Sequence, residues 1–138
     1  MKRTATAHWA GTLKDGKGSL STPSGILNNA NYSFKTRFEE GVTGTNPEEL
    51  LAAAHAGCFT MWVSSLITEK GLQATSLDTV AAITLVDGTI TGSHLTITGN
   101  VTGMTSEEFT ALTKEAETNC IISKSFSFPV SSEAHFVN

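Results

Sequence analysis

The sequence predicts an α+β protein, and three observations lead to this fold class. Alternating residues mark strands in the first 40 positions, a long capped helix follows at about 47–70, and a hairpin, a second helix and a last strand complete the chain. Strands and helices come in runs rather than in strict alternation, which favours α+β over a parallel βαβ array. The length of 138 residues suits one domain. Because no linker or repeat divides the chain, we expect a single domain over residues 1–138.

The first 40 residues are predicted to be strands joined by turns. His8-Trp9 ends an extended run rich in threonine and alanine, and turn-forming residues gather at 14–18 and 23–25. From Tyr32 to Phe38, aromatic residues and threonine alternate with polar residues. This period of two predicts a half-buried strand with Arg37 on its polar face.

The helix at about 47–70 has the strongest sequence signals. Asn46 suits the N-cap, Pro47 suits the first helical position, and Glu49 stands where a capping box needs an acid. Lys70-Gly71 supplies a stop, with a cation in the last turn followed by a glycine that tolerates left-handed backbone.

The composition of this helix predicts what covers it. Its residues are apolar on nearly all sides, which is typical of a buried helix. Residues 52–57 are mainly small and would let another backbone come close. In a chain this short we expect that partner to be a second copy of the same helix, and therefore a homodimer.

The second half of the chain is predicted to be a hairpin, a helix and a strand. Residues 77–85 and 89–101 would pair around Asp87-Gly88, a strong two-residue turn. Thr105 to Glu108 form a capping box that opens an amphipathic helix ending near Asn119-Cys120. A last strand is expected from alternating apolar residues, namely Phe126, Phe128 and Val130.

Charge and hydropathy exclude several classes of partner. A net charge of −4 offers no basic surface for nucleic acid or anionic lipid. The first residues lack the apolar stretch of a secretion signal. The longest apolar run, 50–66, is interrupted by polar residues and is expected to be too short to span a bilayer. We therefore expect a soluble cytoplasmic protein that binds neither nucleic acid nor membrane.

Cys58 and Cys120 are the only cysteines. In a reducing compartment they are not expected to form a structural disulfide. Zinc needs about four ligands at short spacing, and no Cys-x-x-Cys or His-x-x-x-His occurs, so we expect no metal and no other cofactor. Two hypotheses remain open from the residues alone: the cysteines are small buried residues, or they are reactive thiols.

A reactive Cys58 would need help from outside its own helix. A thiolate requires a nearby cation or hydrogen-bond donor, and Cys58 lies in mid-helix. Arg37 is a candidate cation, although it would equally suit a solvated surface. Glu48 lies ten residues before Cys58, which on a helix is about 15 Å, so it cannot reach Cys58 directly. Glu48 would pair with Arg37, act on a second subunit, or simply stabilise the first turn of the helix.

Other residues near Cys58 in sequence allow further hypotheses. His55 is three residues before Cys58 and on the same helix face, which suggests a Cys-His nucleophile for acyl transfer or, alternatively, a histidine that fills space. Phe59, Met61 and Trp62 surround Cys58. They would form core, or an apolar pocket beside a reactive thiol.

One continuous block resembles a known family. Residues 44–59 read Gly-Thr-Asn-Pro-Glu-Glu-Leu-Leu-Ala-Ala-Ala-His-Ala-Gly-Cys-Phe. This block is similar to the osmotically inducible protein C (OsmC) and organic hydroperoxide resistance (Ohr) superfamily. Shorter segments resemble the OsmC branch: Ala7–Trp9, Gly16–Ser19, Ser24–Asn28 and Thr36–Glu39. Cys120 falls at a helix end, where the family's second cysteine belongs.

The resemblance implies a fold and a peroxidase cycle. The fold would have antiparallel sheets wrapped around a long buried central helix, in an intertwined homodimer with sites at the subunit interface. Cys58 as thiolate would attack the peroxide and become a sulfenic acid, and Cys120 would then close a disulfide with it. Arg37 would hold and activate the thiolate, and Glu48 would orient Arg37.

The resemblance also implies partners and one departure. The apolar pocket would suit an organic hydroperoxide better than hydrogen peroxide, in defence against oxidative or osmotic stress, and an external lipoyl or thioredoxin-like dithiol would reduce the disulfide. Ile121 stands where the family usually has proline, so the backbone at Cys120 is less constrained. The alternatives are a low-turnover, small-molecule-binding stress dimer of the same fold and a Cys-His hydrolase or acyltransferase.

Overall fold

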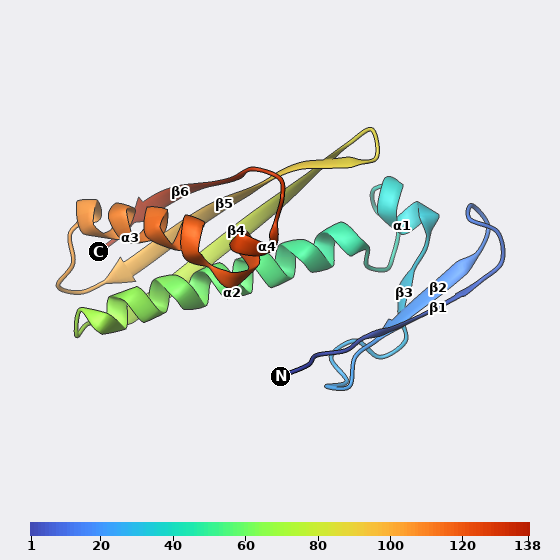
Figure 1. Cartoon of the computed structure of the whole chain (residues 1–138), viewed down its shortest axis with the longest axis horizontal. Helices are drawn as coiled ribbons and strands as arrows, with labels where there is room; N and C mark the ends of the chain where they lie inside the picture. The colour runs from blue at the N-terminus through green and yellow to red at the C-terminus, as the bar shows by residue number, and fades with distance from the viewer. The chain divides into compact units, whose positions relative to one another are not determined.

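A computed structural model describes all residues of the chain, 1–138, as two compact units, 1–50 and 51–138 (Figure 1). The expectation of a single domain over the whole chain stays a prediction.

The first unit is built on a small antiparallel sheet. Its strands are β1 (Thr6–Ala10), β2 (Lys17–Ser21) and β3 (Ala30–Tyr32), in the order β1-β2-β3. Gly18 of β2 pairs with Trp9 on one side and Tyr32 on the other, and the two rings lie 5.5 Å apart. A Cβ at position 18 would clash with both rings, so the glycine lets the aromatic pair close over the strand.

The prediction of a strand from Tyr32 to Phe38 is wrong after its first residue, because a short helix, α1 (Phe34–Phe38), follows β3. Ser33 Oγ accepts a hydrogen bond from the Thr36 N–H at 3.2 Å, and Thr36 Oγ1 accepts one from the Ser33 N–H at 2.7 Å. This reciprocal capping box starts a helix. Phe34 and Phe38 share a face under both a strand and a helix period, and their rings lie 4.7 Å apart. The alternation therefore could not distinguish the two structures.

The predicted long helix is confirmed as α2 (Pro47–Glu69). Asn46 Oδ1 accepts a hydrogen bond from the Glu49 N–H at 2.8 Å, as expected of an N-cap. The Glu49 carboxylate does not close the expected box, because it accepts from the Thr45 hydroxyl instead, at 2.7 Å. Beyond the other end, Gly71 adopts a φ of +76°, the left-handed stop that the sequence predicted.

The second unit contains a sheet of three strands in the order β4-β5-β6, with β4 at Ala74–Val86, β5 at Thr89–Val101 and β6 at Val130–Phe136. β4 and β5 form the predicted hairpin, with positive φ at both Asp87 and Gly88. β6 runs parallel to β5, although antiparallel sheets were expected, because the chain crosses the sheet through a helix before it returns. The last strand also begins later than predicted, so Phe126 and Phe128 precede it.

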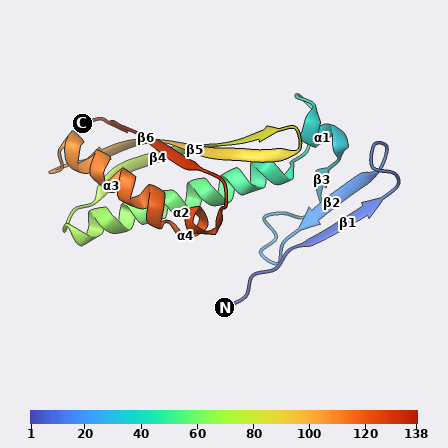
Figure 2. The same cartoon turned by 45° about the horizontal axis from the view of Figure 1, so that its top comes forward.

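The helices of the second unit cover one face of its sheet. α3 (Ser106–Asn119) begins at the predicted capping box of Thr105 and Glu108, and a short helix that was not predicted, α4 (Ile121–Ser125), follows it. Figure 2 shows α2, α3 and α4 on the same side of the sheet. Their apolar side chains meet those of β5 in one core, whose largest members are Phe59, Phe109, Ile67, Leu95 and Ile97.

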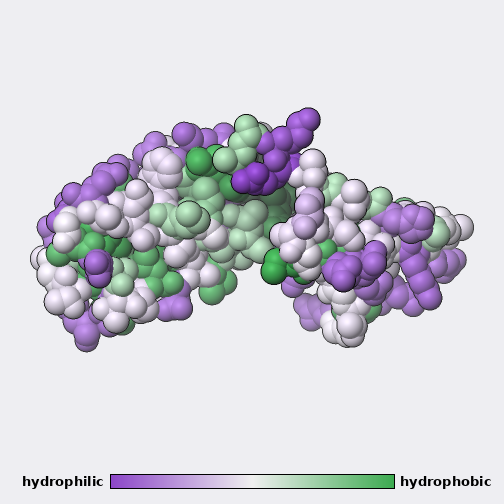
Figure 3. All heavy atoms as spheres, turned by 90° about the horizontal axis from the view of Figure 1, so that it is seen from below, coloured by the Kyte–Doolittle hydropathy of each residue, from purple (hydrophilic) through white to green (hydrophobic).

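Within one chain, α2 is buried along one side only. His55, Phe59 and Val63 face the core, whereas Met61 is 75% exposed. Seen from the side of α2, hydrophobic side chains are visible on the surface of this unit (Figure 3). By length and composition α2 is apolar enough to cross a membrane, contrary to the expectation from 50–66, although core helices of folded proteins pass the same test. The absence of a membrane partner stays a prediction.

Candidate active site

The two cysteines meet in the second unit. Cys58 lies in the middle of α2 and is half-buried, and Cys120 is fully buried. Cys120 occupies the junction where α3 ends and α4 begins, so it caps both helices. Its thiol shares a hydrogen bond with that of Cys58, with 3.0 Å between the two sulfur atoms. Residues that are 62 positions apart are therefore in direct contact, as a resolving pair requires.

The surroundings of Cys58 within this unit favour its protonated form. Burial raises the pKa of the Cys58 thiol, and the hydrogen bond with Cys120 raises it further. The backbone N–H groups of Ile122 and Ile121, in the first turn of α4, act in the opposite direction but do not outweigh burial. A reactive thiolate at neutral pH therefore requires an additional positive charge.

An apolar pocket of about 520 Å³ opens beside Cys58. It is lined by side chains of α2 and of the first turn of α4, namely Cys58, Met61, Trp62, Ser65, Ile121 and Ile122. Met61 and Trp62 thus line a pocket at the thiol, as the sequence suggested. Phe59 is fully buried in the core, because one helical step turns it toward the sheet. The walls can hold an apolar molecule against the Cys58 sulfur.

His55 does not serve Cys58. Its ring is fully buried, and its two nitrogens are bonded to serine hydroxyls: Nδ1 lies 2.6 Å from Ser93 Oγ and Nε2 lies 2.7 Å from Ser123 Oγ. Burial lowers the pKa of His55, so the ring is neutral. With both nitrogens occupied, the ring has none left to activate Cys58, which removes the geometric basis for a Cys-His hydrolase.

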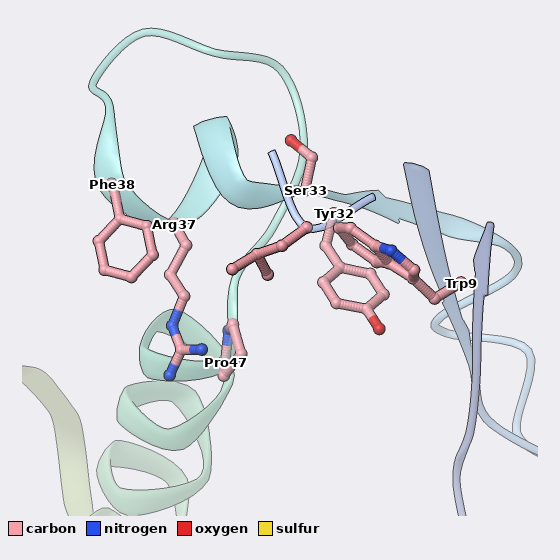
Figure 4. A pocket seen from close by; sticks show the side chains of 7 residues that line it. Trp9, Tyr32, Ser33, Arg37, Phe38 and Pro47 are labelled. Carbon is pink, nitrogen blue, oxygen red and sulfur yellow. The ribbon is translucent and has the colours of Figure 1, made fainter. Parts of the chain in front are cut away.

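Arg37 and Glu48 form an ion pair in the first unit. Arg37 Nη2 and Nε donate to Glu48 Oε1 at 2.7 and 3.0 Å, and Nε also lies 3.2 Å from Oε2. Arg37 belongs to α1, not to a strand as predicted, and Figure 4 shows its side chain extending beside the start of α2. Of the roles left open for Glu48, pairing with Arg37 is therefore present.

The rest of the first-unit site is an aromatic hollow of about 280 Å³ beside Arg37, lined chiefly by Trp9, Tyr32 and Phe38 (Figure 4). The guanidinium also lies 5.6 Å from the centre of the Phe38 ring. Sequence patterns gave no signal for this hollow, nor for Ile122, Ser93 and Ser123 in the second unit, and they singled out Ile121 only as a departure from the family. These residues come together only through tertiary contacts.

Comparison with known proteins identifies the family. The sequence model of the OsmC-like protein family matches residues 39–134, a segment that includes both cysteines. Peroxiredoxin OsmC of Escherichia coli K12 is 43% identical over 122 residues, which cover 86% of this chain and 85% of that protein. The same values hold for peroxiredoxin OsmC of Shigella flexneri. The chain belongs to the OsmC-like family.

Solved structures show the same fold at lower identity. The organic hydroperoxide resistance protein OhrB of Bacillus subtilis superimposes with a TM-score of 0.68 at 23% identity, covering 97% of this chain and 98% of that one. An OsmC-like protein of unknown function from Vibrio cholerae gives a TM-score of 0.72 at 15% identity, covering 97% and 99%. The α+β, OsmC-like fold is thus confirmed.

The paired thiols and the curated relatives together define the class. The sulfur of Cys58, in the middle of α2, touches that of Cys120 at the α3–α4 junction, and the OsmC peroxiredoxins match most of the chain. The protein is a cysteine-based peroxidase.

Proposed function

We propose that the protein reduces organic hydroperoxides through Cys58, with Cys120 as the resolving thiol. The observation that carries this proposal is the contact of 3.0 Å between the two sulfur atoms at the edge of an apolar pocket. A pocket with almost no polar lining favours an alkyl or aryl hydroperoxide over hydrogen peroxide, because only the former has apolar surface to bury.

The cycle has three balanced steps. The Cys58 thiolate attacks the terminal peroxide oxygen, the O–O bond breaks, and the substrate leaves as an alcohol after it takes up a proton. Cys120 then attacks the sulfur of the Cys58 sulfenic acid, so that an S–S bond forms and the hydroxyl leaves as water with the thiol proton. An external dithiol, lipoyl or thioredoxin-like, reduces the disulfide and is itself oxidised.

Arg37 and Glu48 supply the electrostatics in this proposal. The Cys58 thiol needs a positive charge, because its own surroundings raise its pKa. The bidentate contact with Glu48 holds Arg37 in one orientation, and we propose that the guanidinium stabilises the thiolate and the leaving oxygen. We further propose a cytoplasmic homodimer, since one side of α2 is exposed in a single chain and rich in small residues.

The decisive experiment separates the roles of the two thiols. After one equivalent of cumene hydroperoxide, mass spectrometry should find a Cys58–Cys120 disulfide in the wild type and no oxidation at either cysteine in Cys58→Ser. Cys120→Ser should still react once, leaving sulfenic or more oxidised acid at Cys58. Equal single-turnover rates in the wild type and Cys58→Ser would refute the assignment.

The same experiment tests the alternatives. An unmodified wild type would favour the low-turnover binding dimer. Acylation of Cys58 by ester substrates would favour a hydrolase, against which the two occupied nitrogens of His55 already argue.

A further inference from the structure

A buried polar cluster links α2, β5 and α4. His55 of α2 connects two elements through its ring, with Ser93 of β5 bonded to Nδ1 and Ser123 of α4 bonded to Nε2. His55 is fully buried, and Ser93 and Ser123 are 2% and 8% exposed. Hydrogen bonds in such a setting are costly to break, since water does not replace the lost partner.

This cluster is close to both thiols along the chain. His55 precedes Cys58 by three residues in α2, and Ser123 follows Cys120 by three residues at the start of α4. The Ser123–His55 bond therefore joins the two short segments that carry the reacting sulfur atoms. Phe126, just beyond α4, adds a second contact, with its ring edge-on to the imidazole at 4.9 Å.

α4 has few other polar attachments. The side chains of residues 120–125 make only two hydrogen bonds to other elements, Cys120 with Cys58 and Ser123 with His55. The Cys120 cap also gives α4 no side-chain hydrogen bond. Once Cys58 is oxidised, its thiol is no longer available as the original partner. The bond to His55 is then the one polar side-chain contact that keeps α4 in place.

We propose that His55 is a positioning residue for disulfide closure, which holds α4 and Cys120 against α2 while the Cys120 thiol attacks Cys58. The proposal rests on the proposed function for its place in the cycle. The neutral ring donates from one nitrogen and accepts at the other, so each serine hydroxyl finds a matching partner. His55 acts through Ser123 and not on the reacting atoms.

The test uses a probe that needs no peroxide. With dithiodipyridine, the half-exposed Cys58 thiolate attacks the reagent disulfide and releases one thiopyridone. The buried Cys120 thiol then attacks the Cys58 sulfur of the mixed disulfide, forms the Cys58–Cys120 bond and releases a second thiopyridone with its proton. Stopped-flow absorbance resolves the two releases, so attack and closure are measured separately in the full-length protein.

The variants differ in which hydrogen bond of His55 they remove, the one to Ser123 of α4 or the one to Ser93 of β5. Ser123→Ala should slow the second release by about fivefold, as loss of one buried hydrogen bond suggests, and leave the first within twofold. Ser93→Ala is the matched control, because it removes the same group from His55 without touching α4, and both releases should stay within twofold. Ser123→Thr keeps the hydroxyl and should restore closure. His55→Gln should resemble Ser123→Ala.

Two outcomes would overturn the proposal. In one, Ser123→Ala closes the disulfide at the wild-type rate. In the other, Ser93→Ala and Ser123→Ala slow both releases equally, which is the behaviour of general loosening. If His55→Gln does not fold, the serine pair decides alone. If the wild type closes with dithiodipyridine but cumene hydroperoxide leaves Cys58 unoxidised, the proposed function fails and the positioning role stands.

Discussion

The two units of the chain differ in what holds them together. Every buried hydrophobic side chain lies in residues 51–138, where two helices and a sheet share one core. In residues 1–50 the only buried side chain is that of Thr36, and Leu13, Ile26 and Phe38 are more than half exposed. A small sheet without its own core is marginally stable alone and needs another surface to cover it.

This difference separates the chemistry into two parts. The thiol pair belongs to the unit with a core, so the contact between Cys58 and Cys120 is fixed by that unit's own packing. The charge belongs to the unit without a core, where Arg37 is oriented by Glu48. Closure of the Cys58–Cys120 disulfide should therefore still occur in variants of Arg37 or Glu48 in which Cys58 is no longer activated.

The largest effect is expected from Arg37→Met. Burial raises the pKa of Cys58, so without a cation little thiolate exists at pH 7, and oxidation should slow by about tenfold or more. As pH rises toward that pKa the thiolate forms unaided, so the defect should shrink in alkali. Stopped-flow oxidation and iodoacetamide alkylation against pH measure both.

Two further variants serve as controls for Arg37. Lys35→Met removes a charge from the same helix and should have little effect, whereas Glu48→Gln should show a weaker form of the Arg37 defect. Identical pH profiles for the wild type and Arg37→Met would show that Arg37 is only a surface residue. The unit 1–50 would then not supply the charge that activates Cys58.

A change at Gly57 tests whether a second copy covers α2. In one chain nothing lies within 4 Å of a Cβ added at this position, so Gly57→Ala should raise the free energy of unfolding by up to about 1 kcal/mol. If a second α2 packs closely here, the added methyl group separates the two helices and destabilises the dimer. We expect this second outcome. Light scattering should then show a shift toward the monomer of 14.5 kDa. Thr110→Ala, at an exposed position of α3, is the control for helix propensity. A wild type that is monomeric at micromolar concentration would refute the dimer.

The smallest effect is expected from Ile121→Pro. Proline suits the first position of α4, and Cys120 already has φ −52° and ψ 133°, which a following proline permits. The substitution removes an N–H that lowers the pKa of Cys58, so alkylation at pH 7 should slow about two- to threefold. Ile121→Ala keeps the N–H and is the matched control. Equal slowing of alkylation in both variants would show that the Ile121 side chain in the pocket wall, and not its N–H, is responsible.

The sequence predicted best those elements whose signals are local. Asn46 acts through its own side chain, Gly71 and the Asp87-Gly88 turn act through their own backbone, and each is found as expected. α1 was missed because the spacing of Phe34 and Phe38 fits two periods, although Ser33 and Thr36 carried a capping signal. α4 is too short to show a period.

The site was less accessible from sequence than the fold. The contact of Cys58 with Cys120 spans 62 positions, and only family resemblance suggested it. The serine partners of His55 come from β5 and α4, which no spacing along α2 reveals. For Glu48, the length of the helical rise excluded a direct contact with Cys58 but left its partner open, and the structure pairs it with Arg37.

A disulfide at Cys120 would also change the stability of the folded protein. A bond from Cys58 to Cys120 would close a covalent ring around the β4–β5 hairpin and α3. In the chain-entropy account, a ring of this size stabilises the folded state by about 4 kcal/mol. The oxidised protein would then unfold less readily on heating than the reduced protein, so each catalytic cycle would pass through a more stable and a less stable form of the same fold.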